Sequence, residues 1–172
     1  VYKSSNGGST WVSISQGFGE NLNHLKIAPS SNLVMYASHG NTLYKTINGG
    51  TTNWTQLSGF SGSINSIAIH PTNPNKVAIA TTSDQKVYVS NNGGITWISY
   101  LYDLPDFSAQ ALVWENNGKD GLYLGMNYGV YYIDNEFNTI WQSFSNNLPN
   151  VIISELEINY ADNKLYAATY GR

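Results

Sequence analysis

A short motif, S/T-x-N-x-G-x-x-W, recurs along this chain at a nearly constant interval. The full copies run from Ser4 to Trp11, from Thr46 to Trp54 with one extra residue before the tryptophan, and from Ser90 to Trp97. A degenerate fourth copy keeps Trp141 and the spacing, so the four tryptophans lie 43, 43 and 44 residues apart. A period of about 40–50 residues is typical of arrays of small repeated units, of which propellers are one kind.

The segments between the motifs have the pattern of short β-strands. In the best-defined unit these are Ser66–His70, Val77–Thr81, Val87–Ser90 and Trp97–Tyr100, separated by turns rich in Asn, Pro and Gly. The other units align with this one, and no helical period of useful length occurs. Four short antiparallel strands per unit make one blade of a β-propeller, so the sequence predicts an all-β fold.

The ends of the chain are complementary halves of such a unit. The predicted repeats are 1–15 (half), 24–58, 66–101, 111–145 and 155–172 (half). The first half supplies strands three and four, and the last supplies strands one and two. Either the halves pair to close a four-bladed ring, or the chain belongs to a longer propeller. We favour the second, with further domains, because four blades is the lower limit for propellers.

The motif has an architectural explanation at each position. Its Asn bonds nearby backbone N–H groups, its Gly accepts backbone angles closed to other residues, its hydroxyl caps the turn and its Trp packs between neighbouring blades. We therefore assign structural roles to Ser4, Asn6, Gly8, Trp11, Thr46, Asn48, Gly50, Trp54, Ser90, Asn92, Gly94, Trp97 and Trp141.

These motifs resemble the Asp-box, or BNR repeat. That repeat is found in sialidases, in sortilin and VPS10-type receptors, in xyloglucanase-type glycoside hydrolases and in photosystem II assembly factors. The stretches Leu148–Ile158 and Lys164–Arg172 are similar to the last propeller repeat of surface or secreted proteins from type IX-secreting bacteria. The resemblance implies a secreted or cell-surface location. In the fourth copy Glu136 replaces the Asn and Asn138 the Gly, so we expect a rebuilt turn there.

The loops opposite the motif turns hold the candidate functional residues, since propeller ligands usually meet one face and the channel. In the longest loop, Asp103 and Asp106 lie beside Tyr102 and Phe107. A carboxylate pair beside aromatic rings is what a glycosidase needs. The alternative is an Asp-Leu-Pro-Asp turn that caps itself.

A second candidate set falls in the loop between strands two and three of successive units. It consists of His39, Asp84, Tyr128 and Tyr170. Rings around a channel mouth would stack on a sugar or grip an extended peptide, and the alternative is ordinary loop tips.

Composition excludes several classes of function. Charged residues make up 11% of the chain and the net charge is −3, which argues against a nucleic-acid partner. There is no cysteine, no metal-ligating histidine spacing, no cofactor motif and no apolar stretch long enough for membrane insertion. We therefore predict neither a metal nor a cofactor. A sialidase would need an arginine cluster, whereas the sequence has only Arg172.

The sequence thus predicts a noncatalytic recognition or structural module of an exported bacterial surface protein. It would bind a protein or polysaccharide through one face. The alternative is a fragment of a xyloglucanase-type glycoside hydrolase, with Asp103 or Asp106 as acid or base. A third possibility is a sortilin-like binder that holds an extended peptide in its tunnel.

Overall fold

All regular elements among the described residues are short β-strands. The computed structural model describes residues 1–19 and 21–170. The strands are β1 (Tyr2–Lys3), β2 (Val12–Ser13), β3 (His24–Ala28), β4 (Ser31–His39), β5 (Thr42–Thr46), β6 (Thr55–Leu57), β7 (Ile64–Ile69), β8 (Val77–Thr81), β9 (Val87–Ser90), β10 (Ile98–Ser99), β11 (Ala109–Trp114), β12 (Leu122–Met126), β13 (Val130–Ile133), β14 (Gln142–Ser143), β15 (Ile152–Asn159) and β16 (Lys164–Tyr170). The all-β prediction is confirmed.

The strands form antiparallel sheets in which sequence neighbours pair. Three sheets have four strands each, in the orders β3-β4-β5-β6, β7-β8-β9-β10 and β11-β12-β13-β14. β1 pairs with β2 and β15 pairs with β16 in two separate two-stranded sheets. The four-stranded units expected from the repeat are therefore present.

The repeat in sequence is also a repeat in register. An equivalent tyrosine of each third strand lies opposite an equivalent position of the second strand: Tyr44 opposite Ala37, Tyr88 opposite Ile79, and Tyr131 opposite Leu124. Three of the four first strands carry a register shift at the same point, between residues 64 and 66, 109 and 111, and 153 and 155. A shared bulge bends each of these strands alike.

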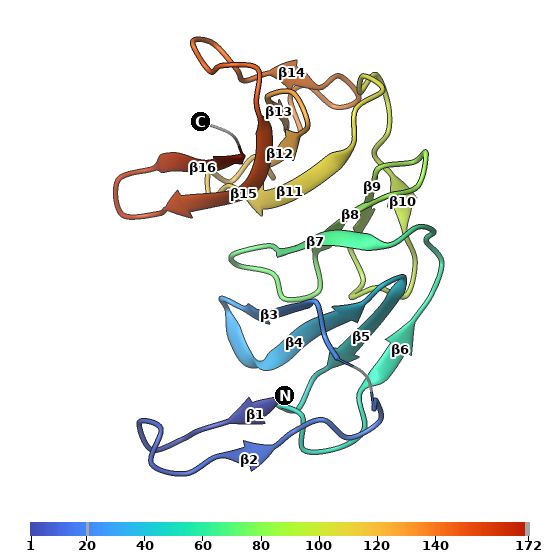
Figure 1. Ribbon diagram of the computed structural model, residues 1–172, viewed down its shortest axis with the longest axis vertical. Coiled ribbons are helices and arrows are strands. Elements are labelled where there is room, and N and C mark those ends of the chain that lie inside the picture. Colours follow the sequence, from blue (N-terminus) through green and yellow to red (C-terminus); the bar gives the residue numbers. More distant parts are fainter. Residues whose placement is uncertain (20, 171–172) are drawn as a thin grey trace.

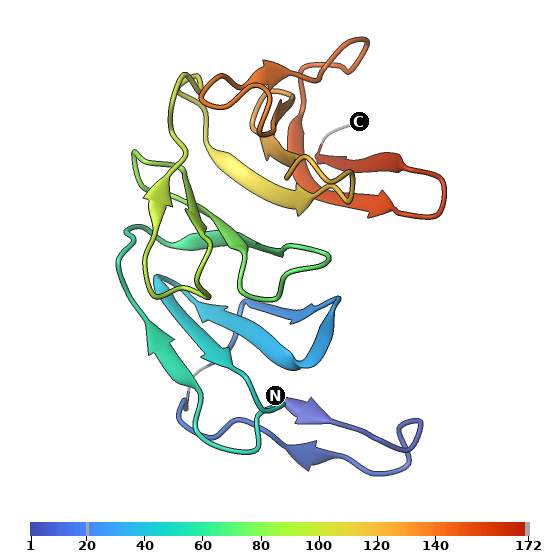
Figure 2. The ribbon, with the colours of Figure 1, turned by 180° about the vertical axis from the view of Figure 1, so that it is seen from behind.

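The sheets follow one another along an arc (Figure 1). The first strands, β3, β7, β11 and β15, lie toward the open side of the arc, and the last strands lie on its outer side. The view from behind shows the β1–β2 and β15–β16 sheets at opposite ends (Figure 2). Gly171 and Arg172, which belong to the last predicted repeat, lie outside the described residues.

The core lies between the faces of adjacent sheets. One cluster joins Tyr36 and Leu43 of one sheet to Ile67 and Ile79 of the next. A second, built around Trp114, fills the following interface. Because both faces of a middle sheet are buried, β8 and β12 read as continuous apolar runs with little alternation.

The motif turns share one hydrogen-bond pattern. In the second copy, Gly50 N–H donates to Thr46 Oγ1 at 3.1 Å, Thr46 Oγ1 donates to Asn48 Oδ1 at 2.9 Å, and Asn48 Nδ2 donates to Thr52 Oγ1 at 2.7 Å. The first and third copies repeat these bonds. Gly50 has a φ of 76°, and a Cβ there would lie 2.8 Å from Ile14 Cβ. The turn therefore fits closely against the preceding sheet.

The degenerate fourth copy is rebuilt around Asp134. Its carboxylate Oδ1 accepts hydrogen bonds from Glu136 N–H at 2.9 Å and Phe137 N–H at 3.0 Å. Asn138 takes the left-handed conformation, with a φ of 57°. The expected departure from the pattern is thus present. The buried carboxylate of Asp134 binds the backbone of this turn, as the Ser or Thr hydroxyl and the Asn amide do in the complete copies.

Candidate ligand-binding face

The candidate site is formed by loops that leave the sheets opposite the motif turns. In an antiparallel sheet, the β8–β9 and β12–β13 connections emerge at the same end as the loops that lead to the next sheet. Residues 82–86, 100–108, 127–129 and 144–151 make up these connections. They line two neighbouring hollows.

The first hollow is polar and has a volume of about 380 Å³. Its lining residues are Asn65, Thr81, Thr82, Ser83, Asp84, Lys86, Asp106, Phe107, Ser108, Ala109 and Gln110. Lys86 is nearly buried, and its Nζ lies 3.0 Å from Oδ1 of the exposed Asp106. The ion pair links the two loops that bound this hollow.

The second hollow is more apolar and has a volume of about 480 Å³. It is lined by Phe107, Tyr128, Gly129, Tyr131, Ser143, Ser145, Leu148, Pro149 and Asn150. Phe107 lines both hollows, and its ring centroid lies 4.9 Å from that of Tyr128 at an interplanar angle of 60°. Both rings are partly exposed, so they offer apolar surface beside hydrogen-bonding groups.

Hydrogen bonds made by the first residues of β11 fix the boundary of the site. Gln110 Nε2 donates to Asn127 Oδ1 at 2.8 Å, and Asn65 Nδ2 donates to the Ala109 carbonyl at 2.8 Å. Sequence reasoning missed Lys86, Gln110 and Asn127 as parts of this site. Their contacts span 17 to 20 residues, and no local pattern signals them.

The structure gives Asp103 and Asp106 different partners. Asp103 Oδ1 accepts a hydrogen bond from the backbone N–H of Trp141 at 2.8 Å, in the next motif turn. Asp106 instead pairs with Lys86 on the polar hollow. The two carboxylates of this loop therefore have separate partners, one in the next motif turn and one on the polar hollow.

The remaining predicted residues divide between this site and other places. Asp84 and Tyr128 join Phe107 on the candidate face. His39 ends β4 in the first four-stranded sheet, and its Nδ1 contacts the carbonyl of Asn21, which precedes β3. Tyr170 ends β16 at one end of the arc, and Tyr102 lines a separate hollow with Asp120 and Asn138.

That separate hollow, of about 60 Å³, borders a polar cluster. Asp120 contacts His70 Nε2 at 3.2 Å and Lys76 Nζ at 2.8 Å, and accepts from Asn135 Nδ2 at 3.0 Å. Burial disfavours the charged carboxylate, but the hydrogen bonds from Lys76 and Asn135 prevail and lower the pKa of Asp120. Burial lowers the pKa of His70, and Asp120 opposes this only in part.

The hydroxyl of Tyr132, beside the same cluster, lies within hydrogen-bond distance of two carboxylates. Tyr132 Oη lies 3.0 Å from Glu115 Oε2 and 3.1 Å from Asp134 Oδ2. Burial and these carboxylates raise the pKa of Tyr132 far above its usual range, so the phenol keeps its proton. The cluster is a set of satisfied polar contacts between loops and strands.

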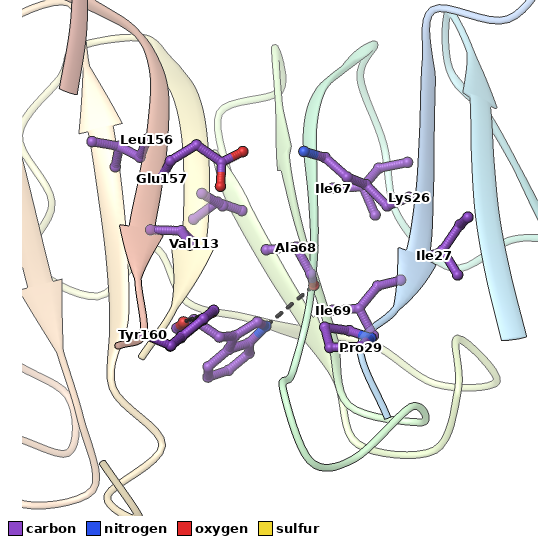
Figure 3. Close-up of a pocket in the computed structure, with 12 residues that line it drawn as sticks. Lys26, Ile27, Pro29, Ile67, Ala68, Ile69, Val113, Leu156, Glu157 and Tyr160 are labelled. Atoms are coloured by element: carbon purple, nitrogen blue, oxygen red, sulfur yellow. Dashed lines mark hydrogen bonds between the residues drawn. The ribbon is translucent and has the colours of Figure 1, made fainter. Parts of the chain in front are cut away.

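The open side of the arc carries a shallow apolar groove of about 160 Å³ (Figure 3). Lys26 and Glu157 reach toward each other from opposite walls, and Trp114 Nε1 donates to the Ala68 carbonyl at 3.2 Å. Lys26 Nζ also lies 3.8 Å from Glu155 Oε1. None of the predicted binding residues lines this groove.

The described part of the chain forms neither a cluster of metal-binding side chains nor a membrane-spanning helix. No three His, Cys, Asp or Glu residues there are grouped to hold a metal ion. Nor do residues 1–19 and 21–170 form a helix with the length and apolar character of a membrane span.

Comparison with known proteins places the fold. No protein-family model matches the sequence, and no curated protein matches it either. Among solved structures, an ancestral GH74 enzyme superposes with a TM-score of 0.73 over 98% of this chain, at 22% identity. YCF48 bound to a D1 peptide gives 0.70 over 98% at 15% identity. The GH74 xyloglucanase from Xanthomonas campestris gives 0.67 over 93% at 17% identity.

These matches establish a β-propeller fold. The chain spans 24% of the ancestral GH74 enzyme, 54% of YCF48 and 29% of the xyloglucanase. It therefore corresponds to about a quarter to a half of each protein. At these identities the likeness concerns the fold, because unrelated functions share such scaffolds.

Proposed function

We propose that this chain is a noncatalytic recognition module that binds a polysaccharide or a protein segment through the face opposite its motif turns. The observation that carries the proposal is the Phe107–Tyr128 ring pair between a polar and an apolar hollow. Aromatic rings beside a few placed polar groups are the usual composition of a ligand site.

The chemistry of the face favours a neutral, extended ligand. The Lys86–Asp106 pair balances its own charge, whereas Ser83, Gln110 and Asn150 offer uncharged hydrogen-bonding groups. Sugar rings combine an apolar face with hydroxyl groups, and stacking on Phe107 and Tyr128 would use both properties. A peptide of alternating apolar and polar residues would likewise use both the aromatic rings and the hydrogen-bonding groups.

The repeat family and the cellular location are part of the same proposal. The three complete motif turns support an Asp-box repeat protein, and the C-terminal resemblance supports an exported bacterial surface protein. The neighbours support the proposed classes of ligand, since YCF48 was solved with a bound peptide and a GH74 neighbour is a xyloglucanase. A glycosidase role for this chain is less well supported, because Asp103 is engaged by Trp141 N–H.

The direct test is binding to neutral polysaccharides. We expect a soluble xyloglucan or a mixed-linkage glucan to retard the protein in affinity gel electrophoresis. Phe107→Ala should weaken this retardation at least about fivefold, because stacking of a ring on an aromatic side chain is worth roughly 1–3 kcal/mol in comparable nucleobase sites.

The matched control is Phe137→Ala. Phe137 is a similarly exposed phenylalanine in the fourth motif turn, at the end of its sheet opposite the candidate hollows, and it lines neither of them. Its loss should leave retardation unchanged. Equal weakening by both substitutions, or binding that survives Phe107→Ala with Tyr128→Ala, would contradict the assignment of the face.

A further inference from the structure

The dipeptide Asn-Gly occurs four times in the chain, at residues 6–7, 48–49, 92–93 and 117–118. In this pair the backbone nitrogen of the glycine is able to attack the side-chain Cγ of the asparagine, because glycine has no side chain to obstruct the approach. The product is a five-membered succinimide ring, and the carboxamide nitrogen leaves as ammonia. The reaction needs an accessible glycine nitrogen and a proton for the departing group.

The two pairs in motif turns of four-stranded sheets have a protected glycine nitrogen. Gly49 N–H donates to the Leu33 carbonyl at 2.8 Å, and Gly93 N–H donates to the Asn75 carbonyl at 2.7 Å. The pair at residues 6–7 lies in the two-stranded β1–β2 sheet instead. Because Gly49 and Gly93 are buried, their nitrogens become free for attack only when the turn opens locally.

Gly118 lies at the exposed tip of the loop between β11 and β12. Its N–H has no hydrogen-bond partner among the described residues, and a Cβ built on it would meet no atom within 4 Å. The loop below the tip is fixed, since Glu115 N–H donates to the Gly121 carbonyl at 2.7 Å. The Lys119 carbonyl accepts from Asn135 N–H at 3.0 Å. The nitrogen of Gly118 is therefore accessible in the folded chain, on a loop of defined shape.

The Asn117 carboxamide is held by three groups that suit this reaction. Lys119 N–H donates to Oδ1 at 2.9 Å, where negative charge develops as the glycine nitrogen attacks. Nδ2 donates to Glu115 Oε2 at 2.6 Å and to Tyr132 Oη at 3.1 Å. Once Cγ is tetrahedral, Nδ2 has a lone pair, so the Tyr132 hydroxyl is placed to donate its proton to the departing nitrogen.

We infer that Asn117–Gly118 is a self-modifying site at which the asparagine loses its side-chain amide. The bond from Gly118 N to Asn117 Cγ forms, and the Cγ–Nδ2 bond breaks. Tyr132 Oη supplies the proton with which ammonia leaves, while the proton of Gly118 N passes to solvent, which restores the phenol. Water then opens the succinimide at either carbonyl and leaves a carboxylate at position 117, as aspartate or isoaspartate. The reaction needs no oxidant, reductant or other reactant.

The product changes the contacts of the loop. A carboxylate at position 117 adds a third acid beside the Tyr132 hydroxyl, which already lies 3.0 Å from Glu115 Oε2 and 3.1 Å from Asp134 Oδ2. Like charges at this range repel one another. The same loop carries Asp120, which contacts Lys76 Nζ in the β7–β8 turn at 2.8 Å. The modification is therefore expected to loosen, irreversibly, the contact between the β7–β10 and β11–β14 sheets.

Peptide mapping by mass spectrometry of the full chain, incubated at neutral pH, measures deamidation at each site. We expect Asn117 to react at least about tenfold faster than Asn48 and Asn92, a ratio that corresponds to about 1.4 kcal/mol of local opening. In urea, where the turns are unfolded, all three asparagines should react at similar rates. The inference is overturned if Asn117 reacts no faster than Asn48 and Asn92 in the folded chain.

Tyr132→Phe tests the proton donor. It should slow deamidation at Asn117 about tenfold or more and leave the rate at Asn48 unchanged. The matched control is Tyr131→Phe, which removes the hydroxyl on the opposite face of β13 and should change neither rate. General loosening of the fold would raise the rate at Asn48 as well, so a decrease confined to Asn117 has a chemical cause. An unchanged or increased rate at Asn117 in Tyr132→Phe overturns the proposed mechanism.

Asn117→Asp reproduces the aspartate product and tests its consequence. The midpoint of urea unfolding should be lower for this variant than for Asn116→Asp, which adds the same charge at the exposed neighbouring position of the loop. Equal midpoints for the two variants would contradict the expected loosening of the contact between the sheets.

Discussion

At the scale of single residues, the same tryptophan occupies different environments in successive motif copies. Trp54 and Trp141 are buried and donate to the preceding sheet, whereas the buried Trp97 Nε1 has no hydrogen-bond partner among the described residues. Trp97 instead packs its ring against Phe60, with centroids 5.4 Å apart. Neither the indole hydrogen bond nor ring burial is therefore constant among the copies, since Trp11 of the first copy is 61% exposed.

This difference predicts unequal effects of one substitution. Trp54→Phe should lower the free energy of unfolding by about 1–3 kcal/mol more than Trp97→Phe, because only the first leaves a buried carbonyl unpaired. Urea unfolding followed by circular dichroism measures both values. Equal losses would show that the indole N–H bond contributes nothing to stability.

At the scale of elements, most of the strands could be predicted, because the repeat averages the local signal over several copies. The fourth turn could be predicted only as a departure from the pattern. There Asp134, two residues before the position of the usual Asn, accepts from the N–H groups of Glu136 and Phe137, and the motif does not predict this role for it. The Asp103–Trp141 bond spans 38 residues and joins two sheets, so no local rule reaches it.

Contacts between elements also set the response to pH. The lowered pKa of Asp120 means that its charged form stabilises the folded state above the ordinary value of 3.8, and that this contribution is lost as pH falls through the folded pKa. The lowered pKa of His70 acts in the same direction, since protonation opposes folding below about 6.5.

We therefore expect the free energy of unfolding to decrease from pH 7 toward pH 3. Asp120→Asn should make this curve flatter between about pH 5 and pH 3, because the titrating group is gone. Asp84→Asn, at an exposed loop position, should leave the shape unchanged. A curve for Asp120→Asn that runs parallel to the wild type would show that other acids control the response.

At the scale of the whole molecule, the sequence predicted blades but only part of the candidate site. Asp84, Asp106 and Tyr128 meet around Phe107, whereas His39, Tyr102 and Tyr170 lie elsewhere. Equivalent loop positions lie at the same end of different sheets. Only loops of neighbouring sheets come into contact, so residues from distant repeats do not meet. The site therefore depends on the packing of two sheets, which a repeat alignment does not encode.

The central claim is that the motif turns are architectural and that recognition occurs at the opposite face. Hydrogen exchange measured by mass spectrometry, with and without the polysaccharide that retards the protein, tests both halves together. We predict ligand-dependent protection in residues 100–108 and 127–131, and unchanged exchange in the turns at 46–54 and 90–97. Protection confined to those turns, with the Phe107 loop unchanged, would contradict the account.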